Sequence, residues 1–163
     1  MSNYPTKHNI MSEQHQLKQE LFLICQENIN KRIATIEERL EAIKESKNNE
    51  TKSSVGDKYE TGRAMLQIEE DKSKSQLAEA QKVQYELSKI NPEKQSDQVE
   101  LGSLVTTNRG VYFIAIGVGQ VKLANQTYFC VSNYAPIVQA LRNKKEGDSI
   151  TFNKLSFEIH SIQ

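Results

Sequence analysis

Two carboxylates, Asp57 and Glu60, lie three residues apart in the segment GDKYE, at a break between two helix-prone stretches. Carboxylate oxygens suit hard divalent cations, and Mg²⁺ usually takes one or two of them together with water and substrate oxygens. Tyr59 lies between the two acids and offers an aromatic ring with a polar tip, suited to contacting a nucleotide or a partner protein. The pair therefore predicts half of a Mg²⁺ site that a partner would complete.

Helix capping offers a second interpretation of the same residues. Asp57 would be the N-cap of the following helix, and Glu60, three residues later, would return a hydrogen bond in a capping box. This interpretation explains both residue types and their spacing without any function. The sequence alone leaves the two interpretations open.

Long helix-prone segments flank this break. In the first, five apolar residues recur at heptad spacing: Ile29, Ile33, Ile36, Leu40 and Ile43. The second segment runs from Asp57 to about Ile90 and stops at Asn91-Pro92. We therefore expect a polar tail over residues 1–12, an antiparallel helical hairpin over 13–91 with its acidic tip near 53–62, and a linker over 92–99.

Residues 100–163 have a different pattern, with short segments rich in β-branched and aromatic residues separated by turn signals such as ANQ, EGD and NK. One amphipathic segment, YAPIVQALRNKK, has Pro136 placed for a first helical turn. Ile137 and Leu141 on this segment are expected in the core. The chain is thus predicted to be α+β, with the hairpin followed by an antiparallel sheet of about five strands and one short helix.

Composition narrows the classes of function. The chain has 21 basic and 21 acidic side chains, so broad attraction to nucleic acid or to a membrane surface is not expected. Cys25 and Cys130 are expected to be buried thiols far apart in space, as in a reducing compartment. No apolar leader or membrane-length segment is visible, which predicts a cytoplasmic protein. No enzyme signature is found either, since the Gly117–Gly119 segment lacks the rest of a dinucleotide fingerprint.

Beyond these patterns, the sequence resembles the bacterial Gre-type transcript-cleavage factors over roughly residues 20–163. The tip of that family reads G-D-x-x-E-N, and here it reads Gly56, Asp57, Glu60 and Thr61. The second domain of the family carries an S-P-I-x-x-A-L-x-G-K-x-x-G-D run and closes with a Y/F-E-I-x-x-I strand. The corresponding residues here are Ala135, Pro136, Ile137, Ala140, Leu141, Lys144, Gly147, Asp148, Phe157, Glu158, Ile159 and Ile162.

The resemblance implies an FKBP-like C-terminal domain that holds bacterial RNA polymerase at the rim of its secondary channel, while the coiled coil enters the channel. Asp57 and Glu60 would be the catalytic and metal-binding pair, helping to hold a Mg²⁺ ion of the polymerase while backtracked RNA is cut at its 3′ end. Asn133, Tyr134, Pro136 and Tyr59 would contact the partner. The chain would then be a monomeric coactivator with no cofactor of its own and no membrane partner, rather than an enzyme.

Three alternatives stay open beside this one. Thr61-Gly62-Arg63 stands where the family has Asn-Ala-Glu, and Ala135 stands where it has serine, so a non-cleaving polymerase regulator of the same architecture is possible. The hairpin could also be a coiled-coil protein-interaction module in which Asp57 and Glu60 only cap a helix. A prolyl isomerase is the weakest alternative, because the sheet offers no Trp and few aromatic residues to line a pocket.

Overall fold

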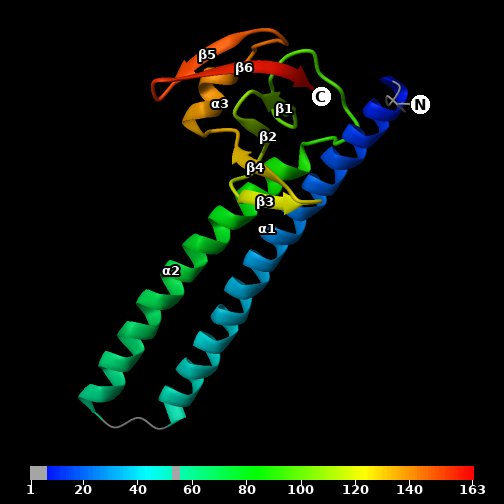
Figure 1. The fold of residues 1–163 in the computed structure, drawn as a ribbon. Helices are drawn as coiled ribbons and strands as arrows, with labels where there is room; N and C mark the ends of the chain where they lie inside the picture. The colour runs from blue at the N-terminus through cyan, green and yellow to red at the C-terminus, as the bar shows by residue number, and fades with distance from the viewer. Residues whose placement is uncertain (1–6, 53–55) are drawn as a thin grey trace. The chain divides into compact units, whose positions relative to one another are not determined.

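A computed structural model confirms the α+β class, with a long helical hairpin followed by a sheet and a short helix (Figure 1). It describes residues 7–52 and 56–163, without the side chains at positions 7–12, 51, 52, 57 and 58. The elements are α1 (Lys7–Lys52), α2 (Asp57–Ser88), β1 (Leu104–Thr107), β2 (Gly110–Ala115), β3 (Gly119–Leu123), β4 (Gln126–Ser132), α3 (Pro136–Leu141), β5 (Ser149–Phe152) and β6 (Leu155–Ile162).

Helix α1 begins at Lys7, earlier than the start near residue 13 that the sequence suggested. Positions 7–12 contain neither Gly nor Pro, so nothing local ends the helix there even though the apolar stripe starts later. Part of the expected polar tail, residues 1–6, lies outside the described residues.

Contacts divide the chain into two compact units, residues 28–85 and residues 1–27 with 86–163. The hairpin unit contains most of both long helices, which run antiparallel side by side (Figure 1). Ile29, Ile36 and Ile43 are buried along α1, and Ser73 and Ala80 are buried along α2. The heptad stripe predicted for α1 is therefore confirmed as the apolar seam of the hairpin.

Polar contacts also join the two helices of the hairpin unit. Arg39 Nη1 donates a hydrogen bond to Gln76 Oε1 at 3.1 Å. Glu70 of α2 forms ion pairs with Lys47 of α1 and with Lys74 on its own helix. Hydrogen bonds from Lys47 and then Lys74 lower the pKa of the Glu70 carboxyl to about 2. The Lys47–Glu70 ion pair thus joins the two helices of the hairpin unit.

The sheet of the other unit has six strands in the order β3-β4-β2-β1-β6-β5. Its pairs are antiparallel except for β2 and β4, which run parallel. The prediction of about five antiparallel strands was therefore incomplete. Strand β3 carries the chain back along the outer edge, so β4 lies beside β2 in the same direction.

Two hairpin turns in the sheet follow the turn signals of the sequence. Ala124-Asn125 joins β3 to β4, and Asn153-Lys154 joins β5 to β6. All four residues have positive φ angles, between 48° and 64°. Two-residue turns with both residues in this region match the right-handed twist of the flanking strands. These turns fix the pairing register of both hairpins.

Two sets of buried residues place helices against the sheet. One core contains Ile114, Phe157 and Ile159 from the strands together with Val138 and Leu141 from α3. Ile137 packs partly buried against this core, as expected. Leu21 and Cys25 of α1 are also fully buried, as are Phe113 and Cys130 of the sheet. The first turns of α1 thus belong to the same compact unit as the sheet.

Candidate functional site

The acidic tip lies where α2 begins. Gly56 has a φ of 65°, a left-handed conformation that favours glycine, and Tyr59 N donates to Gly56 O at 3.1 Å. Glu60 is exposed on the first turn of α2, and Tyr59 is half-buried. Asp57 is the first residue of α2, but its side chain and residues 53–55 of the tip lie outside the described residues.

This helix start bears on the capping interpretation. Because α2 begins at Asp57, the N-cap position falls on Gly56 and the N3 position falls on Tyr59. A capping box needs a hydroxyl or acidic residue at the first position and Glu or Gln at the second. In this register, Asp57 and Glu60 both lie in the first turn of α2, where acidic side chains interact favourably with the helix dipole. Capping of α2 does not require a carboxylate at either position.

A third carboxylate lies near the tip, which the sequence reasoning missed. Glu50 of α1 packs against the backbone of α2 at Gly62, where an added Cβ would lie 3.2 Å from Glu50 Oε2. Gly62 therefore allows this close approach between the helices. No local sequence signal pairs the two residues, because the contact depends on how the helices align across the turn.

The residues expected to bind a partner fall into two groups. Asn133, Tyr134 and Pro136 lie together in the connection between β4 and α3, whereas Tyr59 lies in the hairpin unit. Tyr134 is 66% exposed. Asn133 is held in place, because Arg142 Nη2 donates to its Oδ1 at 2.9 Å and Gln139 Nε2 donates to its backbone oxygen. The connection thus presents Tyr134 outward from a fixed backbone.

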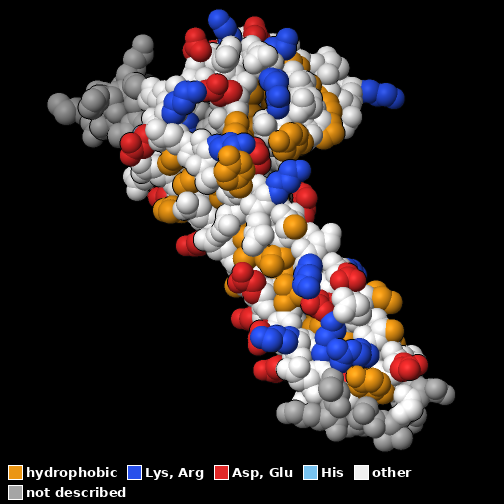
Figure 2. Space-filling view, turned by 180° about the vertical axis from the view of Figure 1, so that it is seen from behind, with side chains coloured by type: hydrophobic (Ala, Val, Ile, Leu, Met, Phe, Trp, Pro, Cys, Tyr) orange, Lys and Arg blue, Asp and Glu red, His pale blue; other side chains and the backbone are white. Residues whose placement is uncertain are grey.

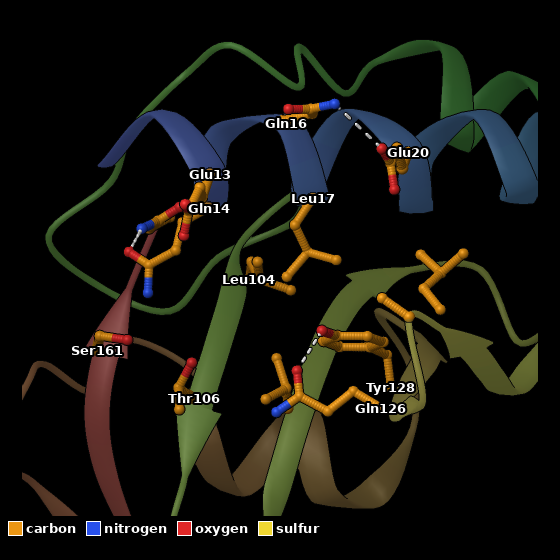
Figure 3. A pocket seen from close by; sticks show the side chains of 14 residues that line it. Glu13, Gln14, Gln16, Leu17, Glu20, Leu104, Thr106, Gln126, Tyr128 and Ser161 are labelled. Carbon is orange, nitrogen blue, oxygen red and sulfur yellow. Dashed lines mark hydrogen bonds between the residues drawn. The ribbon is translucent and has the colours of Figure 1, made fainter. Parts of the chain in front are cut away.

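A pocket of about 550 Å³ lies between the start of α1 and the sheet, inside one compact unit (Figure 3). Leu17 points from α1 toward the sheet, and Tyr128 donates a hydrogen bond to Gln126 Oε1 at 2.6 Å. Glu13 and Glu20 bring carboxylates to the lining, and none of the lining side chains that the structure describes is Lys, Arg or His. The pocket includes none of the predicted site residues.

Lys18 is a buried base that the sequence reasoning did not single out. It is only 3% exposed, and its Nζ donates to Lys94 O at 2.6 Å. Burial lowers the pKa of Lys18 to about 8. The nearby charge of Glu100 acts to raise this pKa, and that of Lys94 acts to lower it. The ammonium of Lys18 thus joins α1 to the segment that follows α2, and it loses most of its contact with water in doing so.

This burial predicts how Lys18→Met changes stability with pH. Between about pH 8 and 10.5 the unfolded chain keeps a proton on Lys18 that the folded chain has released. The free energy of unfolding of the wild type should therefore rise relative to the variant by about 2–3 kcal/mol across this range. Paired urea titrations at pH 7, 8.5 and 10 measure the difference, and a difference that does not change with pH would contradict the burial of a charged Lys18.

Within residues 7–52 and 56–163, no group of three or more His, Cys, Asp or Glu side chains could hold a metal ion. No helix in those same ranges is long and apolar enough to span a bilayer. On the face seen in Figure 2, basic and acidic side chains are interspersed rather than gathered by sign.

No protein-family model, curated protein or solved structure matches the chain. Its function must therefore be inferred from the residues themselves and from where the fold places them. The most specific feature is the exposed acid on the first turn of α2, together with the fixed loop of Asn133, Tyr134 and Pro136 in the other unit.

Proposed function

We propose that the chain is a factor for bacterial RNA polymerase that inserts the tip of its hairpin into the secondary channel and stimulates cleavage of backtracked RNA. The observation that carries the proposal is Glu60, an exposed acid on the first turn after Gly56, at the end of a two-helix arm. A second acid, Asp57, begins the same helix. The polymerase supplies the catalytic site, and the chain is its coactivator.

The dimensions of the arm support this role. Residues 28–52 of α1 extend about 37 Å at the rise of an α-helix. An arm only two helices wide can enter a channel that a globular domain cannot.

The chemistry of the tip also fits. Glu60 is exposed, so its oxygens are available to a cation that a partner brings. A Mg²⁺ ion of the polymerase, when bound, would supply charge stabilisation and an activated water for phosphodiester hydrolysis. The role of this chain would be to add one or two oxygen ligands to that Mg²⁺ ion.

Binding to purified RNA polymerase is the experiment that tests this function first. The resemblance places Asn133, Tyr134 and Pro136 at the contact, and Tyr134 has the exposed aromatic ring typical of an interface anchor. The immobilised chain should retain bacterial core RNA polymerase from solution. Failure to retain it at any salt concentration down to 50 mM would contradict the proposal.

Tyr134→Ala should weaken this binding by about 10-fold or more, because truncating an anchoring aromatic residue commonly costs over 1 kcal/mol. The melting temperature should change little, since the side chain is mostly exposed. Leu155→Ala is the matched control, as Leu155 is an exposed apolar residue in the same unit. Equal binding by both variants would remove Tyr134 from the interface.

A further inference from the structure

The two cysteines, expected to be far apart, are neighbours. Cys25 of α1 and Cys130 of β4 lie in one compact unit, close enough for each thiol to shift the pKa of the other. Both residues are free thiols with 0% exposure. The prediction of distant thiols was wrong because it considered a helix and a strand without knowing which faces meet.

Other contacts of α1 with the sheet place the two cysteines together independently. Leu17 and Tyr128 line the same pocket, so that stripe of α1 faces that side of β4. Residues 17, 21 and 25 follow each other along one face of a helix, and residues 128 and 130 point to the same side of a strand.

We propose that Cys25 and Cys130 are an oxidation site, at which a peroxide converts the two thiols into a disulfide that ties α1 to β4. In the first step a cysteine thiolate attacks one peroxide oxygen, which gives a sulfenic acid and releases the other oxygen as water after protonation. The second thiol then attacks the sulfenic sulfur, forms the S–S bond and releases a second water. Two thiols and one hydrogen peroxide thus yield one disulfide and two waters.

Either thiol can be the one that the peroxide oxidises, and the other then resolves its sulfenic acid. Since both are fully buried, the peroxide reaches them when the start of α1 opens from the sheet.

The disulfide would close a loop that contains most of the chain. Closing a loop of about 100 residues removes much of the freedom of the unfolded state, and for a protein of this size the melting temperature should rise by about 10 °C. Dithiothreitol should reverse the rise completely. A stabilisation of this kind would make the attachment of α1 to the sheet depend on the oxidation state.

The test treats the full chain with hydrogen peroxide, blocks remaining thiols with iodoacetamide under denaturing conditions, and maps the peptides by mass spectrometry. The expected product is an intramolecular Cys25–Cys130 disulfide. The cross-linked peptide pair should weigh two hydrogen atoms less than the two free peptides together, and dithiothreitol should separate it. Two alkylated thiols after prolonged exposure, or sulfinic acids without a cross-link, would overturn the proposal. A dimer linked through one cysteine would overturn it as well.

Matched variants separate the cross-link from other effects of oxidation. Cys25→Ser and Cys130→Ser should each show no reversible rise in melting temperature with peroxide. Each variant should instead accumulate a sulfenic acid at its remaining cysteine, which dimedone labels. A reversible rise in either variant would contradict the proposal, because neither can form the bond.

Discussion

Leu21→Ala should lower the free energy of unfolding of the compact unit that contains the sheet, residues 1–27 with 86–163, by about 2–5 kcal/mol. Leu21 lies on α1 and is 0% exposed, within the same compact unit as the strands. Truncating a buried leucine removes its transfer free energy and leaves a cavity that the surroundings fill only in part. A loss of this size is a large share of the stability of a typical domain.

Amide hydrogen exchange over β2 and β4 measures this effect where it should occur. Leu23→Ala is the matched control, because Leu23 lies two residues away on the same helix and is 54% exposed. It should change the opening free energy by no more than about 0.5 kcal/mol. Equal exchange in the two variants would mean that the strands fold without the start of α1, as a separate domain over residues 100–163 would require.

Local patterns were sufficient for much of the fold. The stripe from Ile29 to Ile43 indicated the hairpin because heptad spacing places these residues on one face of a helix whatever the rest of the chain does. Pro136 indicated the start of α3, and it is the first residue of that helix. The turn at Asn153-Lys154 was likewise visible as a local signal.

Features that depend on contacts between distant segments could not be predicted in this way. The parallel pairing of β2 with β4 depends on which edge β3 occupies, and no residue in these strands encodes that choice alone. The contact between Cys25 and Cys130 depends on the face that α1 turns to the sheet. Burial of Lys18 was hidden because a lysine in an otherwise polar stretch is usually exposed.

At the candidate site, the sequence identified residue types and spacing but not the helix register. The sequence placed the start of the second helix at Asp57 but took this residue as the N-cap, whereas in the structure Asp57 is the first helical residue. The Glu50 carboxylate beside Gly62 was likewise visible only once both helices were placed.

Glu60→Gln should reduce stimulated RNA cleavage by at least about 10-fold, while binding to the polymerase persists. Glutamine keeps the size and polarity of the side chain but removes the charge that a divalent cation needs. Loss of even an outer partner of a metal ligand commonly costs 10- to 100-fold in activity, so losing a direct ligand should cost no less. Asp57→Asn should act in the same direction, because an amide at that position cannot replace the charge of a carboxylate.

Stability should not account for these losses. Glu60 is exposed, and removing one first-turn acid changes the helix by about 0.3–1 kcal/mol. Glu69→Gln is the matched control, since Glu69 is an exposed acid further along α2. Its cleavage stimulation should equal that of the wild type. A similar loss with Glu69→Gln would point to the overall charge of the arm rather than to a ligand at the tip.

The length of the RNA in purified, backtracked bacterial elongation complexes shows whether the chain stimulates RNA cleavage. Complexes in which the 3′ end of the RNA has left the active site are incubated with Mg²⁺. The wild-type chain, the Glu60→Gln variant or no factor is added, and the RNA is resolved by gel electrophoresis. We expect rapid shortening of the RNA with the wild type alone, followed by renewed elongation when nucleotides are added. Wild-type chain that binds the complex and leaves the RNA at full length, or equal shortening with Glu60→Gln, would contradict the proposed function.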